Sequence, residues 1–332
     1  MRAVAKLPAD DRRALFANTA DKTGLTTAII EKDFLVCWTL DYLFHRCKWK
    51  DNLAFKGGTS LSKAFHLIER FSEDLDLILD WRVLGYGKEE PWEQRSKTKQ
   101  ERFNDEANER ASCFLRNEFV SALQDDISTE LGENVQIEVD ESDTQTILFT
   151  YPQESSDHPI LQQIRLEIGA LAVWTPSEQK DIKSYAAEHY AHVFADPTTS
   201  ILTILPERTF WEKATILHHE ANRSESSKMP SRYSRHYYDV FCLASSWVRA
   251  AAIADLDLLS RVTVFKEKFY PRAWARYMEA KPGSIKLVPP QHNLRILEED
   301  YEHMQAMIFG KKLSFAELMQ GVQALEHEIN NL

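Results

Sequence analysis

The spacing of apolar residues changes from helical to strand-like within one short stretch of the chain. Leu53–Phe55 is an apolar run that stops at a pair of glycines, and Thr59-Ser60 then suits the start of a helix. Four apolar residues at the spacing of one buried helix face predict that helix, namely Leu61, Ala64, Phe65 and Ile68.

Beyond Ser72 the apolar period falls to two, which predicts a strand. The apolar positions of this strand would face the core and its acidic positions the opposite side. The first set is Leu75, Leu77 and Leu79, and the second is Asp74, Asp76 and Asp80.

The same patterns place the remaining elements and the fold class. Amphipathic spacing predicts helices at 10–22, 28–45, 96–127, 180–193, 206–223, 232–247 and 314–330, with further helix from 251 onward. Apolar runs predict strands at 135–139, 146–151 and 164–168, and a break is expected at 197–200. We therefore expect an α+β fold, in which a small mixed sheet forms the core and the C-terminal half is mostly helical.

The acidic strand and the glycines before it suggest phosphate chemistry. Asp74 and Asp76 would lie about 6.6 Å apart on one strand face, close enough to converge on one divalent ion. Mg²⁺ is usually held by one or two carboxylates together with substrate phosphates. A glycine turn that leads into a helix supplies N–H groups for those phosphates. The stretch is not a Walker loop, because Gly-Lys-Ser/Thr does not follow at the required spacing.

Asp-x-Asp alone is equally typical of an ordinary strand with a solvated face. The order Gly57-Gly58-Thr59-Ser60, helix, then Asp74-x-Asp76 is far more specific. It resembles the signature of DNA polymerase β-like nucleotidyltransferases, and in detail that of the AbiEii/MenT toxins of type IV toxin–antitoxin systems.

Two later helices extend this resemblance over most of the chain. Glu207-Arg208-Thr209 followed by Glu212-Lys213 is similar to the segment that carries a characteristic lysine of these toxins. Asp239, four residues after Arg235, matches the context of their final catalytic aspartate. The resemblance implies a nucleotidyltransferase core with N-terminal helices at 1–200, and a helical domain at 201–332 that completes the active site.

The resemblance also implies a reaction and its participants. A nucleoside monophosphate would pass from an NTP to an acceptor, for which the 3′ end of tRNA is expected. The protein would be the toxin of a toxin–antitoxin or abortive-infection (phage-defence) system with a separately encoded antitoxin. The alternatives are nucleotidylation of a protein side chain, an NTP-binding regulator without turnover, and a kinase-type phosphotransferase. Asp74 and Asp76 would bind Mg²⁺ or Mn²⁺. Gly57, Gly58, Thr59 and Ser60 would hold the triphosphate, Lys213 its β/γ end, and Asp239 would position or deprotonate the acceptor.

Two further acidic positions have open roles. Such enzymes commonly carry a third metal-binding carboxylate on a neighbouring strand, for which Glu167 is the candidate and Glu138 the alternative. Either residue also fits the surface of an amphipathic strand. Glu31-Lys32-Asp33 matches a triplet of the family, and we expect a structural role for it ahead of a catalytic one.

Composition and charge limit the class of protein. The 332 residues carry a formal net charge of −11 and only four scattered cysteines, as expected of a reduced, cytoplasmic protein. No signal-peptide pattern and no apolar run of membrane-spanning length are visible. Because nucleic-acid binders are more often basic, any RNA contact must use a local set of charges. One such set is Arg272, Arg276, Lys281 and Lys286, with Trp274 and Tyr277 among them, and the same residues are equally typical of solvated surface.

Overall fold

The computed structural model describes residues 1–72, 74–132, 135–152 and 161–332, and its internal contacts divide the chain into two units. Unit 1 comprises Met1–Ala64 and Glu73–Thr203, and unit 2 comprises Phe65–Ser72 and Ile204–Leu332. The functional division into a core at 1–200 and a completing domain at 201–332 stays a prediction. The assignment of Phe65–Ser72 to unit 2 was not anticipated.

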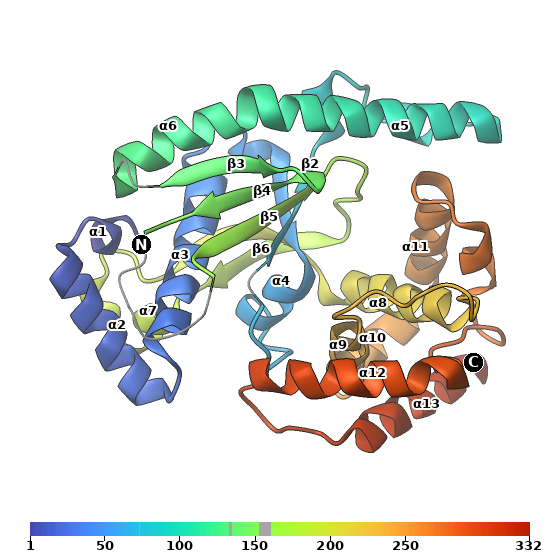
Figure 1. Cartoon of the computed structure of the whole chain (residues 1–332). Coiled ribbons are helices and arrows are strands. Elements are labelled where there is room, and N and C mark those ends of the chain that lie inside the picture. Colours follow the sequence, from blue (N-terminus) through green and yellow to red (C-terminus); the bar gives the residue numbers. More distant parts are fainter. Residues whose placement is uncertain (73, 133–134, 153–160) are drawn as a thin grey trace. The chain divides into compact units, whose positions relative to one another are not determined.

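A seven-stranded mixed sheet forms the centre of unit 1 (Figure 1), in the order β3-β4-β5-β2-β1-β7-β6. β2 pairs in parallel with β5, and β1 with β7, whereas β1–β2, β3–β4 and β4–β5 are antiparallel. The predicted mixed sheet is thus confirmed. The strands are β1 (Leu53–Lys56), β2 (Asp74–Leu79), β3 (Gln136–Asp140), β4 (Asp143–Thr150), β5 (Gln163–Gly169), β6 (Ser177–Ile182) and β7 (Thr199–Ile204).

Helices pack on the sheet of unit 1 and complete its core. They are α1 (Arg2–Ala5), α2 (Ala9–Thr23), α3 (Thr27–His45), α4 (Gly57–Lys63), α5 (Lys97–Phe114), α6 (Val120–Leu131) and α7 (Tyr185–His189). A π-helical turn, Leu115–Phe119, joins α5 to α6 into the long helical run seen along the top of Figure 1. Thr26 caps α3, its hydroxyl accepting a hydrogen bond from the Ile29 N–H at 3.3 Å. Short 3₁₀ turns lie at Lys50–Asn52, Trp81–Leu84, Glu90–Trp92 and Ala191–Val193.

The two faces of β2 differ as its alternating pattern predicts. Leu75, Leu77 and Leu79 are fully buried and belong to one core cluster with side chains of α3 and of the α5–α6 run. Asp74 and Asp76 therefore face the opposite side of the sheet, which is the side on which a polar site can form.

Three local predictions were wrong. The helix after the glycines ends at Lys63, because the chain leaves it for unit 2 and His66 takes a left-handed conformation with φ of 52°. The helix predicted at 180–193 is in fact the end of strand β6 followed by the short α7, since an edge strand needs no apolar alternation on its exposed side. The break expected at 197–200 overlaps the start of β7, whose pairing with β1 overrides the proline and polar residues there.

Unit 2 is mostly helical among its described residues, which confirms the second half of the predicted fold class. Its helices are α8 (Pro206–Ala221), α9 (Ser234–Ala244), α10 (Val248–Ala254), α11 (Leu256–Phe269), α12 (Gln291–Met304) and α13 (Phe315–Asn330). Short 3₁₀ turns lie at Ala273–Ala275, Tyr277–Glu279 and Gln305–Met307. α8 packs against α9, α10 and α11, and α9 packs against α12 and α13, so these two helices are central to the unit. Pro206 occupies the first turn of α8, where its missing N–H costs nothing.

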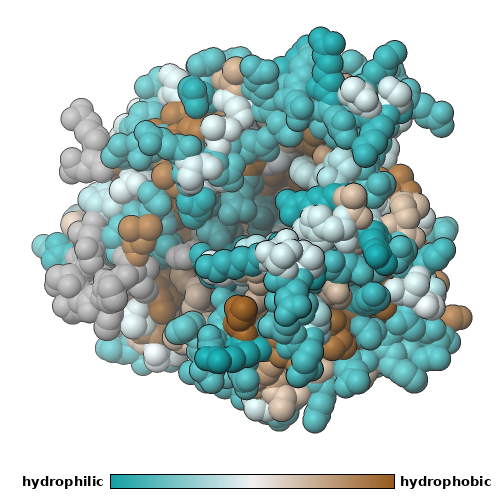
Figure 2. Space-filling view, turned by 45° about the vertical axis from the view of Figure 1, so that its right-hand side comes forward, coloured by the Kyte–Doolittle hydropathy of each residue, from teal (hydrophilic) through white to brown (hydrophobic). Residues whose placement is uncertain are grey.

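Hydrophilic side chains cover most of the face shown in Figure 2, with hydrophobic ones scattered among them. Within the described ranges, no helix has both the length and the apolar character needed to cross a membrane.

Candidate active site

The register of three strands brings acidic and basic side chains into one row on the polar face of the sheet. Asp76 of β2 lies directly opposite Glu167 of β5 and, on its other side, opposite Lys56 of β1. Asp74 lies opposite Arg165. Directly opposed residues of paired strands point to the same face, and neighbouring strands are about 4.8 Å apart. Of the two candidates for a third carboxylate, the register therefore favours Glu167 over Glu138, which is exposed on β3 at the edge of the sheet.

The donor set of this row suits a hard divalent cation. Carboxylate oxygens of Asp74 and Asp76 are the ligands that Mg²⁺ and Mn²⁺ accept, and two carboxylates with substrate phosphates suffice for Mg²⁺. Among the described residues, no three acidic, histidine or cysteine side chains are arranged to hold a metal ion by themselves. Asp74 and Asp76 are thus suited to a divalent ion by their donor atoms, and the metal role of Glu167 stays a prediction.

Gly57 packs directly against the Asp76 carboxylate. It has a left-handed φ of 79°, and a Cβ added to it would overlap the Asp76 side chain. Only glycine satisfies both conditions, because other residues disfavour this backbone region and carry the Cβ that would collide. The glycine turn and the acidic strand therefore pack against each other without room for a side chain at position 57.

We expect Gly57→Ala to abolish the activity that depends on Asp76, because the new methyl group must displace that carboxylate. Gly24→Ala is the matched control, since Gly24 has a similar φ of 71° and no atom within 4 Å of its added Cβ. Both variants should lose about 1–2 kcal/mol of stability through backbone strain. Activity measured beside thermal unfolding separates them, and equal activity of the two variants would contradict the packing argument.

Thr59 and Ser60 are buried and their hydroxyls are engaged within the turn. The Thr59 hydroxyl donates to the Asp74 carbonyl at 2.6 Å, and the Ser60 hydroxyl donates to the Gly57 carbonyl at 2.9 Å. Thr59 thus ties α4 to the first residue of β2. The binding of a triphosphate by these residues stays a prediction.

A buried ion pair fixes the other end of α4. Lys63 pairs with Asp33 of α3, and its ammonium lies 3.6 Å from the centre of the Tyr185 ring. Asp33 also accepts a hydrogen bond from the Tyr185 N–H at 2.7 Å, at the start of α7. Burial disfavours the charged lysine, but the attraction of Asp33 outweighs it and raises the pKa of Lys63. Together with Lys32, whose ammonium donates to the Leu161 carbonyl at 3.0 Å, these contacts give the Glu31-Lys32-Asp33 triplet the expected structural role.

In unit 2 the structure brings Lys213 and Asp239 together and adds an arginine. Lys213 of α8 contacts Oδ2 of Asp239 of α9 at 2.8 Å. Arg70 binds the same carboxylate with two nitrogens, Nε to Oδ1 at 2.7 Å and Nη2 to Oδ2 at 2.8 Å. Asp239 is 0% exposed, and Arg70 and Lys213 are each 7% exposed. We call these three residues the unit 2 ion cluster.

The environment of Asp239 limits its chemistry. Burial alone would raise the pKa of its carboxyl, but Arg70 and Lys213 hold that pKa well below its ordinary value. A carboxylate that resists protonation is a poor proton acceptor. The role of Asp239, to position or to deprotonate the acceptor, stays a prediction.

The comparisons with known proteins agree with the motifs. A family model described as "Nucleotidyl transferase AbiEii toxin, Type IV TA system" matches residues 40–321. The chain belongs to this family. It is thus a nucleotidyltransferase toxin of the type IV kind, as the sequence motifs indicate.

Solved structures similar to this AbiEii-family chain include two bacterial proteins. MenT4, a nucleotidyltransferase toxin of Mycobacterium tuberculosis H37Rv, is 18% identical with a TM-score of 0.43, over 96% of this chain and 97% of MenT4. JHP933 from Helicobacter pylori is 13% identical with a TM-score of 0.44, over 92% of this chain and 94% of JHP933. No curated protein matches the chain.

The sequence did not indicate that two further residues lie beside the predicted site residues of the AbiEii motifs. Lys56 precedes the paired glycines, and only the β1–β2 register shows that it lies opposite Asp76. Arg70 lies four residues before Asp74, and no spacing rule predicts its pairing with Asp239, 169 positions later in the chain. The sequence shows an arginine in the polar turn before the acidic strand, but it does not identify the partner of that arginine.

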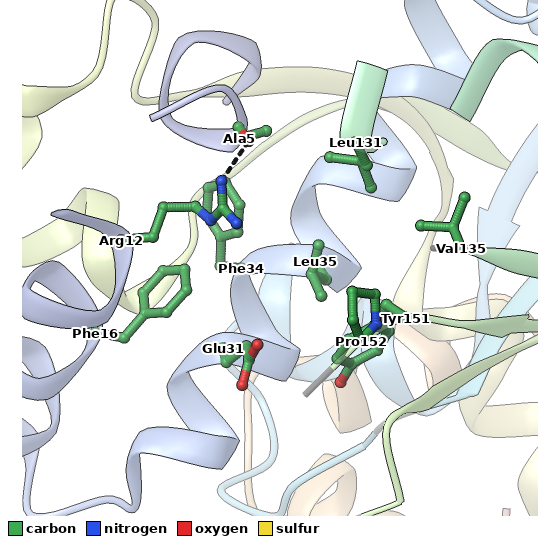
Figure 3. A pocket seen from close by; sticks show the side chains of 10 residues that line it. All are labelled: Ala5, Arg12, Phe16, Glu31, Phe34, Leu35, Leu131, Val135, Tyr151 and Pro152. Carbon is green, nitrogen blue, oxygen red and sulfur yellow. Dashed lines mark hydrogen bonds between the residues drawn. The ribbon is translucent and has the colours of Figure 1, made fainter. Parts of the chain in front are cut away.

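Two cavities of the toxin lie in unit 1 apart from the predicted site residues. The pocket in Figure 3, between α2, α3 and the ends of α6 and β4, holds only about 50 Å³ and is lined by Arg12, Phe16, Glu31 and Tyr151 among others. That volume admits a few water molecules and no nucleotide. A larger hollow of about 520 Å³ lies beside the start of β1, lined by residues that include His45, Lys50 and Ser200.

We expect the toxin to lose stability as the pH falls below about 6.5. Burial, together with Lys213 and Arg235, lowers the pKa of His236 well below its ordinary 6.5, and burial lowers those of His218 and His219. The unfolded chain then binds more protons than the folded one in this range, so stability decreases with decreasing pH. Urea unfolding at several pH values should show this slope. His236→Gln should reduce this slope by up to about 1.4 kcal/mol per pH unit, and a slope equal to that of the parent would contradict the assignment.

Proposed function

We propose that this toxin transfers a nucleoside monophosphate from an NTP to the 3′ end of an RNA, with tRNA as the expected acceptor, and releases pyrophosphate. One observation carries the proposal: Gly57 packs against Asp76, so that the glycine turn and the acidic pair form one structure. The glycine turn would bind the phosphates, and the adjacent carboxylates would bind a cation. This arrangement fits phosphoryl transfer, because catalysis of that reaction depends mainly on positioning the reactants and neutralising their charge.

A divalent cation, Mg²⁺ or Mn²⁺, would be held by Asp74 and Asp76, with Glu167 as the third carboxylate. When bound it would neutralise charge on the phosphates. The protein's own part is to fix these carboxylates: Gly57 supports Asp76, and the Thr59 hydroxyl holds the Asp74 backbone at 2.6 Å. The turn formed by Gly57, Gly58, Thr59 and Ser60 would receive the triphosphate.

Lys213 would neutralise the β/γ end of the triphosphate, which is the leaving group. Its ammonium is a compact charge, and the 2.8 Å contact with Asp239 restricts its position. Asp239 would act through Lys213 as a positioning residue. That Asp74, Asp76 and Lys213 serve one reaction is an inference from the family motifs.

The acceptor is proposed to be RNA because the protein offers a local basic surface despite its net charge of −11. Arg272, Arg276, Lys281 and Lys286 are all exposed in the segment between α11 and α12. His218 fixes this segment to α8, accepting from the Lys286 N–H at 3.0 Å and contacting the Arg276 carbonyl at 3.1 Å. Tyr277 is buried, and Trp274 is half-buried with the Arg223 guanidinium 4.6 Å from the centre of its ring, so the proposed RNA contact rests on the four basic residues.

The acceptor can be identified by incubating the protein with total RNA and total cell protein and each of the four α-³²P NTPs. Label at RNA 3′ ends, located by sequencing, is the expected result, and co-expression of a neighbouring antitoxin gene should relieve toxicity. Label in protein alone would move the function to protein nucleotidylation, and NTP binding without label in either would indicate a regulator.

A further inference from the structure

Arg165 of β5 lies on the polar face of the sheet, beside the predicted metal ligands. The strand register places it directly opposite Asp74 of β2 and, on its other side, opposite Leu148 of β4. Glu167 is two residues further along β5, so its side chain points to the same face. Arg165 is therefore a basic residue of the candidate site, on the β5 side of the acidic strand.

A carboxylate near the edge of the sheet fixes one nitrogen of this arginine. Nη1 of Arg165 donates to Oδ2 of Asp140, at the end of β3, at 2.8 Å. The other oxygen, Oδ1, accepts from the Ser142 N–H and hydroxyl at 2.8 and 2.7 Å, in the turn between β3 and β4. The pair spans β4, the strand between β5 and β3 (Figure 1), and the turn holds its acidic partner in place.

The rest of the Arg165 guanidinium group can receive a ligand. A guanidinium carries five N–H donors in a planar fork, and among the described residues its one hydrogen-bond partner is Asp140. The side chain is 34% exposed, so a ligand can reach it. Burial opposes the charge, but the attraction of the carboxylates of Asp140, Asp74 and Glu167 outweighs it and raises the pKa of the guanidinium. The group is a charged, oriented fork of the kind that binds two oxygens of one phosphate.

The position of the glycine turn indicates which phosphate this is. Gly57 follows the last residue of β1 and packs against Asp76, whereas Arg165 lies on β5, across β2 from β1. In phosphoryl transfer the attacking and leaving oxygens lie roughly in line through the phosphorus atom. With the triphosphate at the glycine turn, pyrophosphate leaves on the β1 side of β2. The acceptor then approaches from the β5 side, where Arg165 lies.

We propose that Arg165, held by Asp140, binds the phosphate that precedes the terminal nucleotide of the acceptor strand. This contact selects an acceptor that has a phosphodiester beside its attacking hydroxyl, which is a property of a nucleic-acid end and not of a protein side chain. The inference rests on the proposed function, since it assumes that the triphosphate binds at the glycine turn. It deepens that function by naming a residue of unit 1 that recognises the acceptor.

The test combines a change in the protein with a change in the RNA. The probe is a fluorescent hairpin RNA with a single-stranded CCA 3′ end, whose last phosphodiester is either native or an uncharged methylphosphonate, and fluorescence anisotropy gives its Kd. For the parent protein, the methylphosphonate should raise Kd about tenfold or more, because charge-assisted hydrogen bonds are lost. Arg165→Gln should weaken binding of the native RNA by a similar factor and bind both RNAs equally within about threefold. A merely structural role would weaken both RNAs alike and preserve the tenfold difference between them.

Two further measurements serve as controls. Arg82 is also a unit 1 arginine paired with an aspartate, since its Nε donates to Asp80 at 2.7 Å, but it follows the end of β2 that is remote from Asp74. Arg82→Gln should keep the tenfold difference between the two RNAs. Arg165→Gln should bind an α,β-methylene NTP with Mg²⁺ within about threefold of the parent, because the triphosphate lies on the other side of β2. A tenfold loss of that affinity, with an undiminished methylphosphonate effect, would assign Arg165 to the nucleotide and overturn the inference.

The outcomes separate this inference from the proposed function. If the parent binds the hairpin and the methylphosphonate has no effect, or if Arg165→Gln keeps the full effect, the role of Arg165 is overturned and the proposed function stands. If the parent does not bind the hairpin, the inference and the tRNA acceptor are both overturned. Thermal unfolding shows whether each variant is folded. If Arg165→Gln fails to fold, Arg165→Lys decides. Its single nitrogen pairs with Asp140, so a methylphosphonate effect of threefold or less supports the inference and a larger one overturns it.

Discussion

Asp76→Asn is expected to reduce nucleotide transfer at least about a thousandfold, with little change in stability. The substitution keeps the shape that packs against Gly57 but removes the charge that would hold the cation. Losing that electrostatic stabilisation costs several kcal/mol in the transition state, and each 1.4 kcal/mol corresponds to about tenfold in rate. Steady-state transfer with labelled NTP measures the loss. Mn²⁺ binding in the presence of NTP, followed by electron paramagnetic resonance, should weaken in parallel.

The matched control for Asp76→Asn is Glu138→Gln. Glu138 is also a strand carboxylate, but it is exposed on β3 and bonds to Gln136 at 3.0 Å. It should transfer nucleotide like the parent. Glu167→Gln should resemble Asp76→Asn if Glu167 is the third carboxylate. If Asp76→Asn transfers nucleotide as fast as the parent at saturating Mg²⁺, the carboxylates of β2 do not take part in the reaction.

Lys63→Met is expected to destabilise unit 1 by roughly 3–5 kcal/mol, the usual cost of leaving a buried carboxylate without its partner. Lys63 and Asp33 have side chains only 9% and 1% exposed, so water cannot replace the lost ammonium. At about 2–4 °C per kcal/mol, the melting temperature should fall by roughly 10 °C. Thermal unfolding followed by circular dichroism measures the shift.

Two further variants test the origin of that loss. Adding Asp33→Asn to Lys63→Met removes the stranded charge and keeps an acceptor for the Tyr185 N–H, so much of the stability should return. Arg13→Met breaks a solvent-exposed pair with Asp10 and should cost under about 1 kcal/mol. If Lys63→Met melts like Arg13→Met, the buried pair does not hold α4 in place.

The sequence predicted the parts of this protein that depend on local pattern. The alternation of Leu75, Leu77 and Leu79 with acidic residues fixed both the strand and its polar face, because the period of two leaves one arrangement. The helices α2, α3 and α13, and the run from α5 to α6, followed their apolar stripes within a few residues. The site residues of β2, α8 and α9 followed from motifs, and their roles stay predictions.

What the sequence missed depends on contacts between distant segments. Phe65 and Ile68 continue a helical pattern, yet the chain turns at His66 because Phe65–Ser72 bonds to residues 307–309. β6 carries charged residues at an edge of the sheet, where pairing and not hydrophobicity makes the strand. Arg70 was invisible for the same reason: its role comes from a carboxylate on α9.

The most direct test of the central claim compares α-³²P with γ-³²P NTP in the presence of Mg²⁺ and total RNA. Nucleotidyl transfer predicts that RNA is labelled at its 3′ end from the α-phosphate and never from the γ-phosphate, that pyrophosphate appears in equal amount, and that Asp76→Asn abolishes the label. Label transferred from the γ-phosphate would contradict the account, because it would make the protein a phosphotransferase of the kinase type.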